Sequence, residues 1–215
     1  MPSIVHATWY RAELSHILGD AAAAEAAAAR VLKHATEKGM TQYIGWSMMV
    51  LGWTRALRGE GEAGIAGMEE GLRMFHGSGM HYHLPHRLTL RANTYAAAGR
   101  IGRAVEAMAE ALQAVESTGE KWYEAEALRM MAELRLARAP ADGAAAEALL
   151  EQALAAARAR LARGWELRIA ADLGALLRQQ DRDGAAQALL RPLVDFFAGE
   201  TPYADLERAR SLLKP

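Results

Sequence analysis

The stretch GEGEAG (residues 59–64) has the Gly-x-Gly-x-x-Gly spacing of a loop that holds the pyrophosphate of a dinucleotide. Such a loop must follow a β-strand and open a helix, because the phosphates bind at the amides of the helix N-terminus. Here a helical pattern precedes the glycines, and the carboxylates of Glu60 and Glu62 would repel a phosphate. We therefore interpret the stretch as a turn between two helices.

Histidines gather in FHGSGMHYHLPH (residues 75–86), where His81, His83 and His86 have a spacing that could bind zinc or nickel. The stretch contains no Asp or Glu that would complete a ligand set, and it spans a turn between helices. We predict exposed or capping histidines and no metal site. Protonation near pH 6 could still loosen this turn.

The residues needed for covalent or acid–base catalysis do not form a recognisable pattern. The serines are few, and none lies in a nucleophile elbow. The carboxylates follow the solvated faces of predicted helices, as Glu69 and Glu70 do, and nothing in the sequence demands the burial or charged neighbour that would shift their pKa values. The absence of cysteine excludes disulfides and thiolate metal sites. The sequence predicts a protein that is not an enzyme and needs no cofactor.

Charge and hydropathy restrict the partners. Lys and Arg together number 25 and Asp and Glu 26, which leaves a formal charge of −1 and no basic surplus for nucleic acid. No apolar run has the length of a membrane helix, and the first residues lack the pattern of a signal peptide. We expect neither nucleic acid nor membrane as a partner, and a cytoplasmic location.

Glycines recur with a fixed period. Gly19, Gly59 and Gly99 lie 40 residues apart, and a second series, Gly39, Gly79 and Gly119, falls midway with the same spacing. Glycine commonly follows the end of a helix because it adopts the left-handed conformation that closes one. Between the glycines, apolar residues follow helical spacing, and no segment alternates as a strand would. A repeat of this length is typical of a solenoid.

The pattern predicts an all-α chain that forms a single repeat domain over residues 1–215. We expect five helical hairpins at 4–38, 41–77, 80–118, 121–163 and 165–198. Pro202 would precede a last short helix over 203–213, whose Leu206, Leu212 and Leu213 could cover the end of the stack.

Small residues recur inside the hairpins. Leu51-Gly52 with Gly64 and Gly71 occupy equivalent places in the second hairpin, and Leu173-Gly174 with Ala186 do so in the fifth. An apolar–small pair in the first helix and small residues in the second resemble the tetratricopeptide (TPR) repeat, in which they let paired helices approach closely. The resemblance implies a right-handed superhelix of α-α hairpins.

Longer stretches of the sequence resemble a narrower group of repeat proteins. GWTRALRGEGEAGIAGMEEGL, TYAAAGRIGRAVEAMAEAL and above all TGEKWYEAE (residues 118–126) resemble the C-terminal TPR-like region of bacterial regulators built on a signalling ATPase. This group includes adenylate-cyclase-type proteins and maltose-regulator-like transcription factors, and the resemblance covers roughly residues 20–213. The phosphate-binding loop of the ATPase is missing here, so only the role of the repeat region carries over. That role is binding, of a protein or of a small-molecule inducer.

In such arrays the first helix of each hairpin lines the concave face, which allows groove residues to be read from helix phase. The expected groove has an aromatic N-terminal half and a charged C-terminal half, and would suit a peptide with an apolar anchor and an acidic group. Its candidate residues are Trp9, Tyr10, Trp46, Trp53, His86, Asn93, Arg129, Glu133, Arg168 and Asp172. Two alternatives remain: the tryptophans could belong to the core, and the Arg129–Glu133 and Arg168–Asp172 pairs could only stabilise their own helices.

Three functions follow from this reading. The first is a non-enzymatic regulatory scaffold that binds a peptide or protein partner in its groove. The second is a sensor that encloses a small-molecule inducer, and the third is a module that associates with a second copy of itself.

Overall fold

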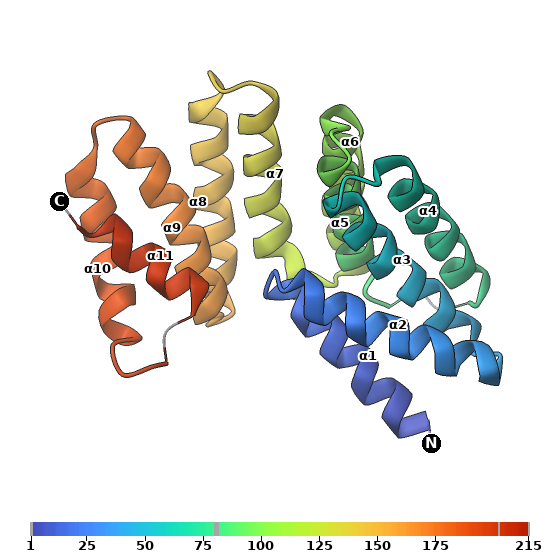
Figure 1. Ribbon diagram of the computed structural model, residues 1–215. Coiled ribbons are helices and arrows are strands. Elements are labelled where there is room, and N and C mark those ends of the chain that lie inside the picture. The colour runs from blue at the N-terminus through green and yellow to red at the C-terminus, as the bar shows by residue number, and fades with distance from the viewer. Residues whose placement is uncertain (1, 80–81, 202, 215) are drawn as a thin grey trace. The chain divides into compact units, whose positions relative to one another are not determined.

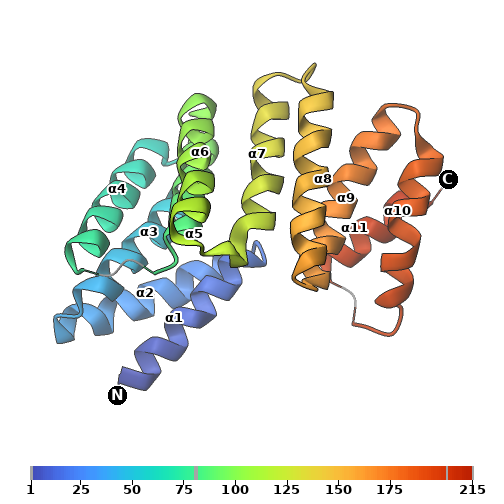
Figure 2. The same ribbon diagram turned by 180° about the vertical axis from the view of Figure 1, so that it is seen from behind.

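The computed structural model describes residues 2–79, 82–201 and 203–214, and these residues form helices joined by short turns (Figures 1 and 2). Contacts divide the chain into two compact units, Met1–Ala111 and Leu112–Pro215. The boundary falls within helix α6 (Ile101–Thr118). Within the described residues, no helix is both long enough and apolar enough to span a membrane.

The N-terminal unit contains α1 (Pro2–Ile17), α2 (Ala21–Lys38), α3 (Thr41–Leu57), α4 (Gly61–Gly77) and α5 (Leu84–Ala97) before α6. Helices α1 with α2 and α3 with α4 pair as hairpins, and α3 also contacts α5 and α1. Helix α3 is therefore covered on several sides. The helix that we expected to begin at residue 80 begins at Leu84, and residues 80 and 81 lie outside the described residues.

The C-terminal unit contains a short 3-10 helix (Lys121–Tyr123), α7 (Glu124–Arg138), α8 (Gly143–Ala159), α9 (Arg163–Gln179), α10 (Asp183–Phe196) and α11 (Ala204–Leu212). Helices α7 with α8 and α9 with α10 form hairpins, and α11 packs on α9 and α10 (Figure 1). Leu206 of α11 is fully buried there, and Leu212 and Leu213 pack against the same core. Pro202, which we expected to open this helix, lies outside the described residues.

The periodic glycines end the helices as their spacing predicts. All six, Gly19, Gly39, Gly59, Gly79, Gly99 and Gly119, have a positive φ. In the C-terminal unit, Leu161 and Asp181 adopt the same left-handed conformation without being glycine. The second helix of the hairpin expected over 121–163 accordingly ends at Ala159, just before Leu161.

Helices α3 and α4 touch through their backbones. A Cβ atom on Gly71 would lie 2.5 Å from the carbonyl oxygen of Gly45, and one on Gly52 would lie 2.6 Å from that of Gly64. The contacts are reciprocal and repeat after seven residues on both helices, so each pair of glycines lies in one line along the interface. These small residues do what the TPR-like pattern requires of them.

Replacing Gly71 by Ala should lower the free energy of unfolding by about 1–3 kcal/mol, because the new methyl group meets backbone atoms that cannot turn aside. Gly67→Ala on the same helix is the matched control, since its Cβ would find the nearest atom at 3.6 Å. That variant should gain up to about 1 kcal/mol from the better helix propensity of alanine. Urea unfolding of both variants measures the difference, and equal stabilities would contradict the close contact.

Candidate functional site

A pocket of about 360 Å³ lies in the C-terminal unit, between α7, α9 and α11 with one contribution from α8. On α7 the lining residues follow helical spacing at positions 129, 133 and 136, and on α9 at positions 172, 175, 176 and 179. The lining consists of Arg129, Glu133, Leu136, Leu150, Asp172, Ala175, Leu176, Gln179 and Arg208. One part of the pocket is charged and the other is aliphatic.

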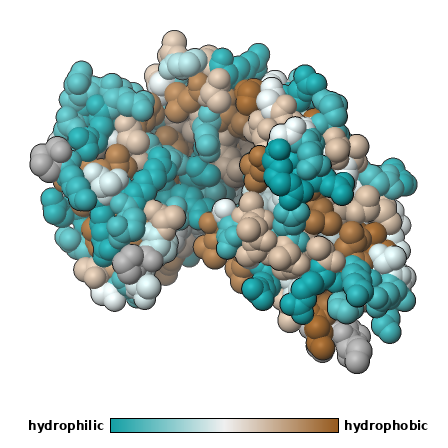
Figure 3. Space-filling model, in the orientation of Figure 1, coloured by the Kyte–Doolittle hydropathy of each residue, from teal (hydrophilic) through white to brown (hydrophobic). Residues whose placement is uncertain are grey.

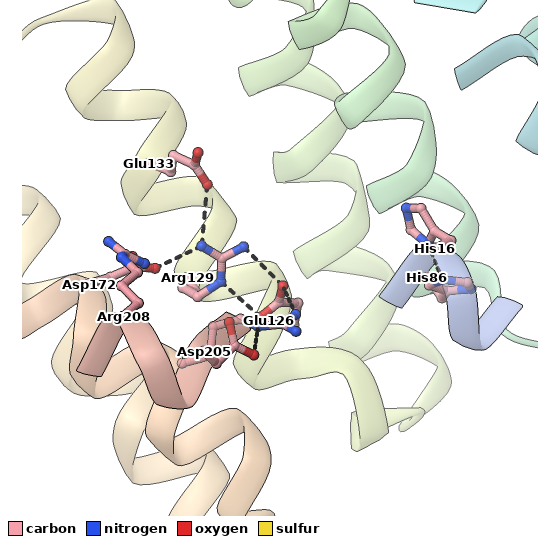
Figure 4. Close-up of polar contacts among 9 residues, drawn as sticks. His16, His86, Glu126, Arg129, Glu133, Asp172, Asp205 and Arg208 are labelled. Atoms are coloured by element: carbon pink, nitrogen blue, oxygen red, sulfur yellow. Dashed lines mark hydrogen bonds and ion pairs between the residues drawn. The ribbon is translucent and has the colours of Figure 1, made fainter. Parts of the chain in front are cut away.

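Arg129 organises the charged part (Figure 4). Its Nε and Nη2 donate to both oxygens of Glu126 at 2.8 and 2.9 Å, which is the two-pronged geometry that a guanidinium forms with a carboxylate. Its Nη1 donates to Asp172 on α9 at 2.7 Å and lies 3.3 Å from Glu133. A single side chain of α7 therefore links this helix directly to α9.

Two further arginines extend the arrangement to α11. Arg168 donates to Glu126 at 3.2 Å and to Asp205 at 2.8 Å, and Arg208 donates to Asp172. We call these seven residues the charged cluster: Glu126, Arg129, Glu133, Arg168, Asp172, Asp205 and Arg208. Glu126, Arg168 and Asp205 lie outside the lining and support the residues that form it.

The cluster keeps its arginines charged in spite of their burial. Burial by itself would lower the pKa of Arg129, but the charges of Glu126 and Asp172 and their hydrogen bonds raise that pKa well above its ordinary value. Burial opposes the charge of Arg168 in the same way, and Glu126 and Asp205 raise its pKa. Both guanidinium groups are thus permanent cations whose carboxylate partners are part of the fold.

The structure brings three of the predicted groove residues, Arg129, Glu133 and Asp172, together in the pocket, and places Arg168 behind it. The pairing within one helix that the sequence allowed for Arg129 and Glu133 is present but long, at 3.3 Å. Arg129 also binds Glu126 within α7, but its shortest bond, at 2.7 Å, reaches Asp172 on α9. Arg168 bonds to Asp205 on α11 at 2.8 Å. Arg208 belongs to this site and was not found from the sequence, because it lies 36 residues from its partner Asp172 and no local spacing links them.

The aromatic half of the expected groove is corrected by the structure. Trp9, Trp46 and Trp53 are 2%, 1% and 8% exposed, so they belong to the core of the N-terminal unit and offer almost no surface. The reason is that α1 and α5 cover the face of α3 that helix phase had assigned to a groove. The rings of Trp9 and Trp46 meet edge to face at 5.8 Å. Tyr10 is half exposed, and Asn93 is partly buried.

His86 is buried rather than exposed or capping, and it joins a polar cluster inside the N-terminal unit. Its Nδ1 lies 3.1 Å from Oε1 of Glu13 on α1, and its Nε2 lies 3.3 Å from Nδ1 of His16 (Figure 4). His83 approaches the same oxygen of Glu13 at 3.3 Å. Arg87, also buried, places its guanidinium 3.8 Å from the ring centre of Phe75. The described residues contain no group of three or more acidic, histidine or cysteine side chains arranged to hold a metal, and His81 lies outside them.

The cluster has a definite protonation pattern. Burial would raise the pKa of Glu13, but hydrogen bonds from His83 and His86 outweigh it and lower that pKa to about 2. Burial lowers the pKa of His86, and the nearby Glu13 only partly opposes this effect. Glu13 is therefore an anion at neutral pH, and His86 beside it is neutral.

Stability should fall as the pH drops from about 7.5 to about 5.5, because the unfolded chain protonates His86 near its ordinary pKa while the folded chain resists that proton. The slope approaches about 1.4 kcal/mol per pH unit for one proton. Glu13 adds its own loss of stability only at lower pH, between its unfolded value of 4.5 and its folded value of about 2. His86 is faced by Glu13 and His16 from α1 and by His83 and Arg87 from its own segment.

His86→Asn keeps a donor near Glu13 but cannot titrate, so it should reduce this slope. His34→Asn is the control, since His34 is exposed on α2 and pairs only with Glu37 within the described residues. Melting temperatures of the wild type and both variants, measured between about pH 5.5 and 7.5, give the pH dependence of stability for each protein. An equal pH dependence in the wild type and in His86→Asn would refute the assigned role of His86.

No protein-family model matches the chain, and neither does any curated protein. Solved structures do match it. The protein BtubC (BKLC) from P. vanneervenii is 18% identical with a TM-score of 0.67, and the match covers 93% of this chain and 81% of that one. Kinesin light chain TPR-like repeats from Podosopora anserina are 17% identical with a TM-score of 0.60, over 92% and 96% of the two chains. The apo form of RapI is 10% identical with a TM-score of 0.58, over 97% and 80%.

At sequence identities this low, the structural matches establish the fold and nothing further. The matches confirm the prediction of an all-α chain built from TPR-like helical hairpins. The helices, the glycines that end them and the close contacts between paired helices agree with these comparisons. This chain has the fold of the TPR-like repeat proteins.

Proposed function

We propose that the chain is a non-enzymatic recognition module that binds a peptide or protein segment in the pocket between α7, α9 and α11. The observation that carries the proposal is the pocket itself, in which a fixed charged part adjoins an aliphatic part. Binding sites of this composition orient a ligand through a few polar groups and hold it through apolar contact. The TPR-like fold supports the proposal, because such repeats typically act as scaffolds for other proteins.

The pocket suits recognition better than catalysis. Its lining consists of arginine, carboxylate, amide and aliphatic side chains. Arg129 and Asp172 are occupied by each other and by further partners, so neither is poised to exchange a proton with a substrate. A preformed and rigid set of charges instead limits the entropy lost when a ligand binds.

The size of the pocket indicates how a partner would use it. A volume of about 360 Å³ holds a few side chains rather than a whole helix. We infer that the pocket receives the anchor residues of a longer segment, which is the usual way in which a few buried side chains dominate an interface. By its resemblance to the repeat regions of bacterial signalling regulators, the module would supply the regulatory contact of such a protein.

A small-molecule inducer is the second candidate, and the same volume favours it, since small-molecule sites begin at roughly 300 Å³. The two candidates differ in what binds, and both require the pocket to be open. A variant that fills the pocket therefore tests them together, while the identity of the ligand separates them.

Ala175→Phe places a ring in the pocket without altering a charge, and should weaken binding at least about tenfold. Short random peptides displayed on phage are selected on the immobilised full chain, and the enriched peptides are measured by fluorescence anisotropy. Ala188→Phe adds the same ring at an exposed position of α10 outside the pocket, and should leave binding unchanged. Circular dichroism checks that both variants keep their helicity.

Peptides that bind wild type and Ala175→Phe equally would place recognition elsewhere and refute the proposal. If no peptide is enriched, metabolite fractions are screened by thermal shift. A compound that raises the melting temperature of the wild type and not that of Ala175→Phe would favour the sensor.

A further inference from the structure

We infer that the segment held in the pocket carries a basic side chain, Lys or Arg, next to an aliphatic one, and that Glu133 receives the positive charge. The inference rests on the proposed function and defines the chemistry of its ligand. It reverses the expectation from the sequence alone, which took Arg129 and Arg168 as receptors for an acidic group.

The reversal follows from the partners of the buried arginines. Both prongs of Arg129 are held by Glu126, and its remaining terminal nitrogen donates to Asp172 at 2.7 Å. An acidic ligand would have to displace one of these carboxylates, which are themselves largely buried. Leaving such a charge buried without its partner is costly. The hydrogen bonds of the buried arginines are therefore used within the fold and are not available to bind an anionic ligand.

The charged cluster contains more acid than base. Its three arginines face four carboxylates, so that one negative charge is not balanced within it. Because binding sites tend to carry charge opposite to that of their ligand, the net negative charge of the cluster favours a ligand that is a cation.

Glu133 is the carboxylate of the charged cluster that is most accessible to a ligand. Its side chain is 68% exposed, whereas those of Glu126 and Asp172 are 4% and 18% exposed. Its contact with Arg129 is long at 3.3 Å and goes to the same nitrogen that binds Asp172 at 2.7 Å. Figure 4 shows Glu133 on the far side of Arg129 from Glu126, away from the most crowded part of the cluster.

The aliphatic part of the pocket begins beside Glu133. Leu136 follows it by three residues on the same face of α7, and Leu150, Ala175 and Leu176 complete the apolar lining. Lys and Arg bury their methylene stems along apolar surface while the charged end stays near water. A basic side chain can therefore lay its stem on these leucines with its charge at Glu133, and an aliphatic neighbour can occupy the remaining space.

Arg208 is the group on which an acidic ligand would depend. Its side chain is 47% exposed and donates to Asp172 through one nitrogen. An anion bound there would lie beside the carboxylate of Asp172, which opposes it. The face of the C-terminal unit seen in Figure 3 is largely hydrophilic.

The test uses the selected peptides and two variants of the full chain. Glu133→Gln should weaken a basic peptide at least about tenfold and remove its preference over the same peptide with norleucine in place of Lys. Arg208→Gln should tighten the basic peptide, because a repelling cation is lost and Asp172 can accept from the ligand. Glu151→Gln, on an exposed position of α8 outside the pocket, makes the same charge change as the first variant and serves as the control.

Each outcome decides between the two proposals. Basic peptides sensitive to Glu133→Gln support the inference. Acidic peptides that lose binding in Arg208→Gln, or uncharged peptides indifferent to Glu133, overturn it while leaving the recognition function intact, provided that Ala175→Phe blocks them. The absence of any peptide that depends on the open pocket overturns both.

Discussion

The close approach of paired helices through small residues is the constraint on which the rest of this structure depends. In the N-terminal unit, glycines of α3 and α4 bring the two backbones into direct contact. In the C-terminal unit, Ala132, Ala146 and Ala153 are fully buried in the core, and Gly174 of α9 accepts the side chain of Leu190 from α10. Because the helices pack this tightly, a side chain of α7 can reach a carboxylate on α9 directly. The charged cluster is thus a consequence of the repeat packing.

The two units use buried charge differently. In the N-terminal unit, Glu13 and His86 are almost wholly enclosed and link α1 to α5, so that their protonation state is bound to folding. In the C-terminal unit, Arg129 is anchored from behind by Glu126, and the cluster opens at Glu133 onto a pocket. Burying a charge is costly unless its partners are in place, so both sets stay in one arrangement. Only the second leaves a charged group where a ligand can meet it.

The tryptophans of α3 show how a correct helical pattern can still assign residues to the wrong surface. Trp46 and Trp53 lie seven residues apart and do share a face of α3, as their spacing requires. Spacing on one helix defines a face but does not say what covers it. Here α1 and α5 pack on that helix, and a pattern that could have served a ligand serves the core.

The sequence by itself determined the helices, their ends and the tight contacts between neighbours, because these depend on local conformation and on residue size. The left-handed glycines and the pairing of Gly52 with Gly64 are of this kind. The tertiary structure decided which polar groups satisfy one another. Arg129 and Asp172 are 43 residues apart, and His86 and His16 are 70 residues apart. Such pairs depend on the angle and depth at which whole helices pack, which no local pattern records. For the same reason, only the fold could show that the buried arginines are already paired and that Glu133 is the most exposed carboxylate of the charged cluster.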